Sequence, residues 1–582
     1  MTTQVVRYAM EQIADEMGYT MVRTARSTII KEIMDITCAV SDAQGRTIAQ
    51  AHHAPMLLTG FEITMRELVQ RFPRGTVEPG DVIAANDPYL GGQHVMDLHA
   101  FTPVFNAGEV VGWVASIAHH ADMGGAAAGG VAGGLTEVYQ EGIRFPMVKL
   151  YRAGAENADV FGIFAANIRV PEKTLGDVRA QAAANFLGAR RLGELFEKYG
   201  AGTVHACAAA LLDQSEGRIR HALRAIPDGD YEGEDFTDDD GVTDRPIRVH
   251  LVIRKRGDAA TVDFAGTDPQ VRGNTNCPIA TVHAAVYYAL ICALDPHVPP
   301  NSGCYRPFTV LAPFGTVVNP RPPAAVGART NTSQKVCEAM FRALAQALPD
   351  RVTAGSHGQI TNCAFSGFLP DAPAGPGGAA TGGQARRRFI YNDIQGGGAG
   401  ARPTKDGRDG QDSHLARFMN TPVEAAELEN PVRIERYELL PDTGGAGHTR
   451  GALGLRRDIR VLVEETGFAR YGDRQKFEPW GLHGGLPGAK GAFRLNPDTP
   501  AEGPLRSKGF DVLHAGDVVS LRLPGAGGMG DPTTRDPALV EADVLDGKVS
   551  PESARDHYGV VVDPATLRFD VAATKALRAT MR

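Results

Sequence analysis

The 582-residue sequence lacks the patterns that mark several large classes of protein. It has no uncharged apolar run near the roughly twenty residues that a membrane-spanning helix needs. Its N-terminus has no charged-then-apolar signal-peptide pattern. Long runs of Lys and Arg are absent and the net charge is −8, which argues against a nucleic-acid partner. These absences predict a soluble, cytoplasmic protein that binds neither membranes nor nucleic acids.

Paired cysteines and nucleotide-binding loops are missing too. The seven cysteines are scattered and odd in number, and none forms a Cys-x-x-Cys pair. They are therefore predicted to be buried, reduced thiols, and a structural zinc ribbon is excluded. The glycine clusters at 396–400 and 524–530 lack the ending of a P-loop and the pattern of a dinucleotide-binding turn. The chain is not expected to bind ATP itself, and no Gly-x-Ser-x-Gly elbow suggests a serine hydrolase.

Potential metal ligands are concentrated between residues 86 and 124. The segments 86–97 and 118–125 each combine histidine and aspartate with glycine, and about twenty residues of strand character separate them. Strands predicted at 81–85 and 110–118 would lead into these two segments. Both segments are therefore expected at strand ends, where loops carry functional groups on a rigid base.

Five residues are predicted to supply metal ligands. His94 and Asp97 are three apart, and His119 could add a third ligand from the neighbouring strand. Glu32 or Asp35, on a predicted N-terminal hairpin, could supply a fourth. Two histidines with one or two carboxylates suit zinc, manganese or iron with an open coordination position. A lone histidine more often satisfies a turn, but so many such groups beside glycine favour a metal site.

His120, Asp122 and Glu141 are predicted to act on the substrate or to orient the ligands. Neighbouring residues of an extended chain point to opposite faces, which favours His119 over His120 as the ligand. His120 and Asp122 are then expected to orient ligands or to move protons. Glu141 is predicted to be a catalytic base or a carboxylate that pins a loop. His99 is a reserve candidate for which a structural role is favoured.

The residue pattern predicts a multidomain, mixed α+β fold. An amphipathic helix is expected at 4–17, with Gly18 as its C-terminal stop, and a hairpin at 31–49. Further helices are expected at 57–72, 278–294 and 333–347. The predicted domains are an N-terminal metal-site domain that ends in two long helices (1–226), a central α/β region with an exposed Pro/Gly-rich loop at 370–384 (227–431), a β-rich region (432–532) and a C-terminal helical segment (533–582).

Several motifs are more specific than these patterns. Asn-Asp-Pro-Tyr-Leu-Gly-Gly-Gln-His (86–94) with Asp97 precedes His-His-Ala-Asp-Met-Gly-Gly (119–125), and Asp-Phe-Ala-Gly-Thr (263–267) and Gly-Met-Gly-Asp-Pro (528–532) follow. Together, and nearly end to end, they resemble the hydantoinase B/5-oxoprolinase family. That family includes the B-type chain of N-methylhydantoinase, the C-terminal half of 5-oxoprolinase, caprolactamase, and the large subunits of acetone and acetophenone carboxylases.

The resemblance implies a divided reaction. A hydantoinase A-like partner would use ATP to phosphorylate a carbonyl or enol oxygen, and the B-type chain would complete the reaction on the activated intermediate. It also implies a divalent metal at His94, Asp97 and His119, with Glu32 or Asp35. We therefore expect a hetero-oligomeric, ATP-dependent hydrolase of cyclic amides such as hydantoins, 5-oxoproline or lactams. The alternatives are a ketone carboxylase and a non-catalytic scaffold stabilised by its metal.

The sequence departs from the family pattern close to the predicted ligands. The family commonly has Thr-His-Leu-Pro-Asp where this chain has Gln-His-Val-Met-Asp (93–97), and Glu-Arg-x-Asp-Phe-Ser where it has Glu-Ile-Met-Asp-Ile-Thr (32–37). The types of ligand are retained. The differences therefore concern the substrate pocket more than the metal.

Overall fold

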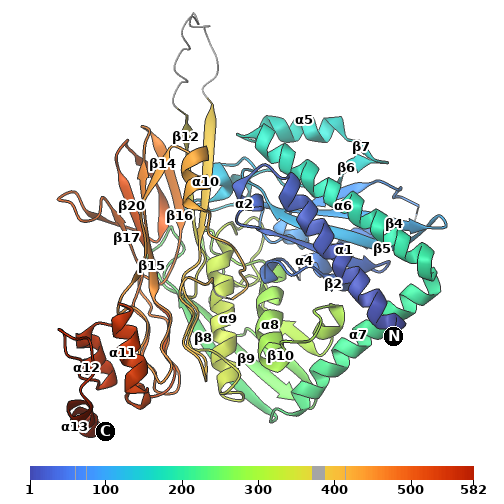
Figure 1. Cartoon of the computed structure of the whole chain (residues 1–582). Helices are drawn as coiled ribbons and strands as arrows, with labels where there is room; N and C mark the ends of the chain where they lie inside the picture. Colours follow the sequence, from blue (N-terminus) through green and yellow to red (C-terminus); the bar gives the residue numbers. More distant parts are fainter. Residues whose placement is uncertain (59, 74, 370–386, 413, 582) are drawn as a thin grey trace, which may run out of the picture.

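The computed structural model describes residues 1–58, 60–73, 75–369, 387–412 and 414–581, and within these ranges the strands form four sheets with helices packed around them (Figure 1). This agrees with the predicted mixed α+β class. The predicted Pro/Gly-rich loop at 370–384 lies outside the described residues. The boundaries of the four predicted domains stay predictions.

The N-terminal region contains a seven-stranded sheet with the order β2-β1-β5-β4-β3-β6-β7. Its first strands form the predicted hairpin, but β1 begins at Ile36 and not at Lys31, which is the last residue of the short helix α2 (Thr28–Lys31). Asp97 pairs with His119 across β4 and β5, and Ile36 pairs with Ala118 across β1 and β5. The start of β1, the start of β4 and the end of β5 therefore lie together at one end of the sheet. The strands are β1 (Ile36–Asp42), β2 (Thr47–Gln50), β3 (Val82–Ala85), β4 (Asp97–Asn106), β5 (Glu109–His119), β6 (Val148–Arg152) and β7 (Ala155–Glu156).

Helix α1 (Thr2–Thr24) is longer than predicted, because Gly18 does not end it. A Cβ atom at Gly18 would lie 2.3 Å from the ring of His53. This glycine therefore permits a close approach inside the helix instead of forming a C-terminal turn. The two long helices were predicted correctly as α6 (Pro171–Tyr199) and α7 (Ala201–Arg224), with Gly200 between them. Helices α1 and α6 lie side by side over the seven-stranded sheet (Figure 1).

The central region packs two helices against a four-stranded sheet, β11-β10-β9-β8. Helix α9 (Arg329–Ala345) begins earlier than predicted and is buried along almost its whole length. It lies so close to β8 that a Cβ atom at Gly233 would be 2.0 Å from the Ala339 carbonyl oxygen. One hydrophobic core extends from α1 through to α9. The elements of this region are α8 (Ile279–Leu294), β8 (Gly229–Thr237), β9 (Ile247–Arg256), β10 (Ala259–Asp263) and β11 (Phe308–Leu311). The other N-terminal helices are α3 (Pro55–Leu58), α4 (Gly60–Arg71) and α5 (Ala158–Asn167).

Two further sheets, β13-β12-β16-β19 and β14-β15-β20-β17-β18, share the core of the C-terminal region. Strands β14 to β20 lie in the predicted β-rich region, whereas β12 and β13 come from the predicted central region. Phe365, Tyr391 and Phe468 point into this core from the first sheet. Its other face is turned towards the N-terminal region. The elements are β12 (Thr361–Phe368), β13 (Arg388–Gln395), α10 (Val423–Glu429), β14 (Val432–Leu440), β15 (Gly454–Val461), β16 (Thr466–Tyr471), β17 (Ala492–Leu495), β18 (Gly503–Leu505), β19 (Lys508–Leu513) and β20 (Val518–Arg522).

The glycine clusters let extended segments pack backbone against backbone. The Gly445 and Ala526 main chains are hydrogen-bonded, and so are those of Gly527 and Gly355. A Cβ atom at Gly527 would lie 1.9 Å from the Trp480 carbonyl oxygen, and one at Gly451 would lie 1.9 Å from that of Ala526. Side chains at these positions would push the segments apart, so glycine here serves packing and not anion binding.

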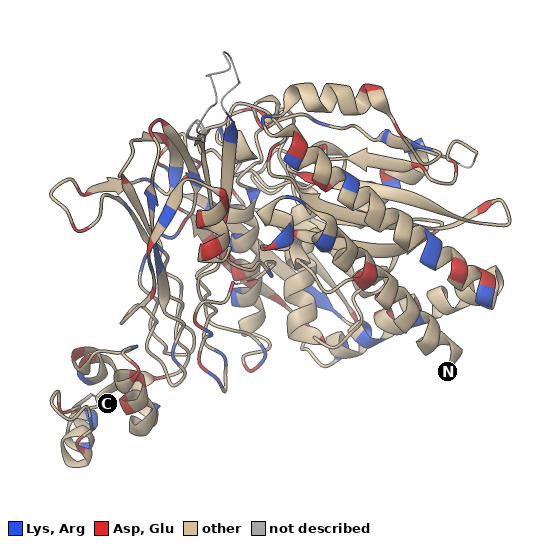
Figure 2. Cartoon of the chain, turned by 45° about the horizontal axis from the view of Figure 1, so that its top comes forward, with Lys and Arg blue, Asp and Glu red and all other residues tan. Residues whose placement is uncertain are grey.

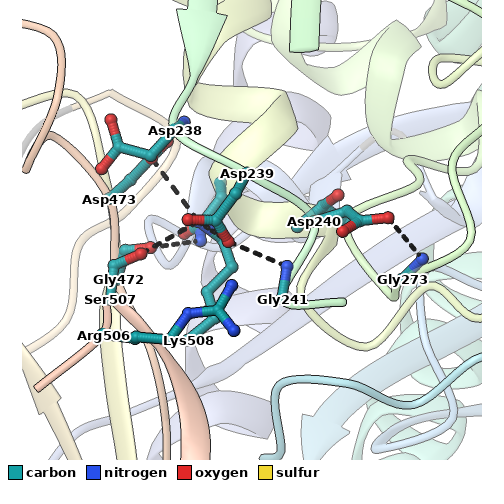
Figure 3. A network of polar contacts seen from close by, with 12 residues as sticks. Asp238, Asp239, Asp240, Gly241, Gly273, Gly472, Asp473, Arg506, Ser507 and Lys508 are labelled. Carbon is teal, nitrogen blue, oxygen red and sulfur yellow. Dashed lines mark hydrogen bonds and ion pairs between the residues drawn. The ribbon is translucent and has the colours of Figure 1, made fainter. Parts of the chain in front are cut away.

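A buried network of charges joins the central region to the C-terminal sheets (Figure 3). Asp473, just after β16, lies 3.1 Å from Lys335 of α9 and 3.5 Å from Lys508 of β19. Its Oδ1 also accepts a hydrogen bond from the backbone of Asp238, which follows β8. Because all these groups are out of water, each charge depends on its partners.

The end of the described chain is helical, as predicted. Helices α11 (Pro537–Leu545), α12 (Pro551–Tyr558) and α13 (Val571–Thr580) lie at the lower left of Figure 1, far from α1 and α7. Basic and acidic positions are both scattered along the long helices of the molecule (Figure 2). All seven cysteines are free thiols, and six of them are buried as predicted. In the described ranges, no helix combines the length and the apolar character needed to cross a membrane.

Candidate metal centre

Three of the predicted ligands meet at the end of the seven-stranded sheet where β1 and β4 start and β5 ends. His94, Asp97 and His119 each offer a ligand atom, and these atoms lie within 4.8 Å of one another. All three side chains are buried. We call these three residues the metal group, because an imidazole, a carboxylate and a second imidazole at this spacing could hold a divalent cation.

The loop before β4 is fixed by its own polar side chains. Asp87 accepts a hydrogen bond from the backbone of Tyr89 at the start of the short 3-10 helix η1 (Pro88–Leu90). Asn86 donates to the Val95 carbonyl oxygen and accepts from the backbone of Phe145. Gly91 then turns the chain with φ of 97°, a left-handed conformation that glycine adopts without strain. His94 and Asp97 are thereby held on a rigid support.

Asp35 lies beside the metal group, whereas Glu32 does not belong to it. The backbone N–H of His119 donates to the Asp35 carbonyl oxygen, and the Asp35 side chain is buried. Burial raises the pKa of the Asp35 carboxyl well above its usual value, and the neighbouring charge of Asp97 raises it further. Glu32 is half-buried at the end of α2. Of the two alternatives, Asp35 is the one placed to be a fourth ligand.

Several donor atoms of the metal group and of Asp35 carry lone pairs that no hydrogen bond occupies. Burial lowers the pKa of His94, and it lowers that of His119 to about 3, so both rings are neutral. Burial opposes the charge of Asp97, but His94 and Arg329 hold the pKa of its carboxyl below the usual range. His94 Nε2 lies 3.1 Å from Asp97 Oδ1, and His94 Nδ1, His119 Nδ1 and Asp35 Oδ1 have no hydrogen-bond partner. Neutral imidazoles beside an ionised carboxylate are the protonation state that metal binding requires, so these residues fit a metal ion.

Arg329 is a part of this site that the sequence pattern did not reveal. Its guanidinium donates to Asp97 Oδ2 at 2.6 Å, across 232 residues of sequence, and only 2% of its side chain is exposed. It also faces Gln93 Oε1 at 3.5 Å. An arginine among small polar residues at the start of a helix gives no local sign of such a partner. Its position follows from the early start of α9.

Glu141 reaches the site through the turn that leads into α9. Its Oε1 accepts hydrogen bonds from the backbone N–H groups of Val326 and Gly327, while Oε2 has no partner. Burial raises the pKa of Glu141 to about 8, against the effect of those two hydrogen bonds. Because the Gly327 backbone also faces the His94 ring, Glu141 supports the segment that carries both Gly327 and Arg329.

The remaining predicted residues contact other partners. His119 and His120 diverge as the strand alternation predicted, and His120 Nε2 lies 3.4 Å from Gln181 of α6. The Asp122 carboxylate accepts hydrogen bonds from the backbone and side chain of Arg169 and from the Gly129 N–H. His99 contacts Thr64 through Nδ1. The structure therefore brings His94, Asp97 and His119 together, with Asp35 beside them, and leaves His120, Asp122 and His99 outside this group.

Comparison with known protein families identifies the family of this chain. The family described as hydantoinase B/oxoprolinase matches residues 1–532, and the chain belongs to that family. A protein of Pseudomonas sp. (strain NS671), provisionally named as the B chain of a D-/L-hydantoinase, is 34% identical, over 99% of this chain and 97% of its own. The beta chain of caprolactamase from Pseudomonas jessenii is 33% identical, over 99% and 98% of the two chains.

Two solved structures have the same fold. The crystal structure of ATP-dependent caprolactamase from Pseudomonas jessenii superposes with a TM-score of 0.89 at 31% identity, and covers 99% of both chains. Nucleotide-free acetone carboxylase superposes with a TM-score of 0.90 and covers 100% of this chain and 82% of its own. At 19% identity, the second similarity shows the fold alone.

Proposed function

We propose that the chain is the B-type component of an ATP-dependent complex that hydrolyses cyclic amides, and that it acts with a hydantoinase A-like ATPase subunit. The observation that carries this proposal is the similarity to the beta chain of caprolactamase over nearly the whole of both chains. The metal group supports it, because a buried cation beside a substrate carbonyl suits amide hydrolysis. Both relatives are named as one of several chains of an enzyme, which supports a partner chain here.

The proposed site divides its tasks among this chain's own residues. His94, Asp97 and His119 would hold a divalent metal together with Asp35, and zinc, manganese and iron all suit this donor set. Such a metal would polarise the amide oxygen or activate water. Arg329 fixes the Asp97 carboxylate and balances its charge. Glu141 supports the turn before Arg329, while His120 and Asp122 hold the loop after β5.

Coexpression with the ATPase subunit tests the function. The purified complex is expected to open a lactam, a hydantoin or 5-oxoproline only when ATP is present, and to release one ADP for each ring opened. The measurement is product formation by chromatography, together with ADP release. The separate chains are the control, because neither is expected to open the ring alone.

The same complex distinguishes the alternatives. Bicarbonate fixation that depends on a ketone and ATP, without ring opening, would contradict the amide proposal and assign the chain to carboxylation. A complex that binds metal but catalyses neither reaction would leave the scaffold as the remaining alternative.

Glu141 is expected to act through position and not as a proton carrier. Glu141→Gln keeps a side-chain oxygen that can accept from Val326 and Gly327, so its activity is expected to stay within about threefold of wild type. Glu141→Ala leaves two buried N–H groups without an acceptor, which costs about 1–3 kcal/mol and displaces Arg329. Activity and thermal stability of both variants would be measured on the complex. An inactive Glu141→Gln that keeps its metal would instead assign Glu141 to proton transfer.

The pKa of Glu141 adds a dependence on pH. Because burial raises this pKa from 4.5 to about 8, the folded chain keeps a proton that the unfolded chain loses between these values. The contribution of Glu141 to the free energy of unfolding is therefore fully present below pH 4.5 and is lost as pH rises towards 8. The melting temperature of wild type is expected to fall more steeply with pH over this range than that of Glu141→Gln. Equal slopes would contradict the raised pKa of Glu141.

A further inference from the structure

The C-terminal sheet β13-β12-β16-β19 brings polar side chains to the metal group. Asn362 of β12 and Tyr471 of β16 are paired in register, so their side chains share one face of the sheet. On that face Tyr471 belongs to the same cluster as Ala325 and Ala328, and Asn331 of α9 donates through Nδ2 to the carbonyl oxygen of Gly472, the residue after Tyr471. The last residue of β16 is thereby placed at the start of α9, next to the arginine that binds Asp97.

A neighbouring strand ties the same face to the loop that follows β5. Asn392 of β13 donates through Nδ2 to the carbonyl oxygen of Ala121, two residues after His119. The nearby Gly129 leaves room for this amide, since a Cβ atom there would lie 2.5 Å from Asn392 Oδ1. The sheet therefore closes over the site at two places, at Arg329 and at Ala121.

The Tyr471 hydroxyl is held as a hydrogen-bond donor. Its oxygen accepts a hydrogen bond from Asn362 Nδ2 at 3.3 Å. Among the described residues, no acceptor receives the hydrogen of this hydroxyl, and Asn362 Oδ1 is also without a partner although it is buried. Burial raises the pKa of Tyr471, and among the charges that act on it are those of Arg329, Asp97 and Asp35. The group is therefore a neutral hydroxyl, next to the metal group, with a hydrogen to donate.

We propose that the Tyr471 hydroxyl is a catalytic residue that donates a hydrogen bond to the substrate oxygen at the metal group, and that Asn362 is its positioning residue. The inference rests on the proposed hydrolysis of cyclic amides. In that reaction the partner's ATP would supply a phosphoryl group to the amide oxygen, a water oxygen bonds to the same carbon, and the carbon–nitrogen bond breaks as the ring nitrogen takes a proton. A second water then attacks the carbonyl carbon of the resulting acyl phosphate, and phosphate leaves. The displaced electron pair gathers on the oxygen attached to the attacked carbon, and a fixed donor at that oxygen lowers the barrier.

Removing the hydroxyl tests the first part of the proposal. Tyr471→Phe is expected to lower kcat by about 10²- to 10³-fold, which is the usual effect of deleting one donor to a developing oxyanion. KM is expected to change by less than about threefold, because the interaction strengthens in the transition state. Metal content is expected to equal that of wild type. Tyr471→Phe with wild-type kcat would overturn the proposal.

Substitutions at Asn362 test the orientation of the hydroxyl. Asn362→Ala frees the Tyr471 hydroxyl to rotate, and a loss of about 10-fold in kcat is expected, as for other supporting groups. Asn362→Asp replaces the donor by an acceptor that captures the tyrosine hydrogen, so it is expected to be as inactive as Tyr471→Phe. A merely structural role would place Asn362→Asp closer to wild type than Asn362→Ala, and that order would overturn the positioning role.

Tyr391→Phe is the matched control. Tyr391 lies in the same four-stranded sheet but points into the C-terminal core, where its hydroxyl donates to Asp393. The change removes an equally buried hydroxyl on the far side of the sheet. Some stability is expected to be lost, by about 1 kcal/mol. Activity per folded complex is expected to be unchanged, and an equal loss of kcat in both Tyr→Phe variants would overturn the specific role of Tyr471.

A spectroscopic readout tests the placement without any turnover. Fluorotyrosine placed at position 471 is expected to lose its fluorine resonance when Mn²⁺ binds the metal group, whereas fluorotyrosine at position 391 should broaden much less. Asp97→Asn should abolish the effect at 471. An unbroadened resonance at 471 with Mn²⁺ bound would overturn the proposal. A wild-type complex that opens no cyclic amide, with broadening still present at 471, would instead refute the proposed function.

Discussion

Replacing His94 or Asp97 is expected to remove bound metal and activity together. Wild type is expected to purify with about one divalent metal ion per chain, and His94→Ala and Asp97→Asn with almost none. Mutations of groups that only support ligands typically weaken metal binding by about 10- to 100-fold, and the loss of a direct ligand should exceed that. The measurements are elemental analysis of the purified chains and ATP-dependent ring opening by the complex.

His99→Gln is the matched control for the loss of a buried histidine. His99 lies on the same strand as Asp97 and is as deeply buried, but its ring contacts Thr64 and packs near Phe61. This variant is expected to keep its metal. Treating wild type with a chelator and refilling it with Zn²⁺, Mn²⁺ or Fe²⁺ would identify the metal that restores turnover. Equal metal contents in wild type, His94→Ala and Asp97→Asn would refute the metal centre.

Removing the charge of Asp473 is expected to cause the largest loss of stability. Asp473→Asn leaves Lys335 and Lys508 fully buried without their shared carboxylate (Figure 3). Breaking a buried ion pair by removing one partner typically costs about 3–5 kcal/mol, because the remaining charge stays out of water. The charged form of Lys335 is expected to be destabilised most, since burial already lowers the pKa of this lysine. Urea unfolding followed by circular dichroism would measure the change in midpoint.

Asp244→Asn provides the comparison at the surface. Asp244 pairs with Lys476 at 2.5 Å, but 78% of its side chain is exposed. Exposed pairs contribute about 0–1 kcal/mol, so this variant should unfold close to wild type. Similar midpoints for Asp473→Asn and Asp244→Asn would show that the buried network does not hold the two regions together.

Local residue patterns predicted the elements of the chain well and some of their ends poorly. Helices α6, α7 and α8 and the strands of the C-terminal region follow from periodicity and turn residues. Gly18 was wrongly predicted to stop α1, because its conformation is set by contact with His53 and not by a turn. The start of α9 at Arg329 was missed because its first turn consists of polar residues that are buried. A pattern of apolar residues cannot mark a helix whose polar side chains face the interior.

The glycine clusters show the same difference between pattern and packing. The sequence predicts turns at these positions, since glycine permits conformations that other residues avoid. In the structure, Gly451 and Gly527 instead allow neighbouring backbones to approach more closely than any side chain would permit. Which segments approach one another depends on contacts between distant parts of the chain, and these contacts leave no local signal.

The sequence by itself determined the metal group. His94, Asp97 and His119 are close in the chain, and strand ends with glycine turns dictate their convergence. Only the tertiary structure favoured Asp35 over Glu32, paired Arg329 with Asp97 and brought Tyr471 to the site from another sheet. The physical reason is separation along the chain: spacing governs contacts within a hairpin, whereas contacts across hundreds of residues depend on how the sheets and helices pack.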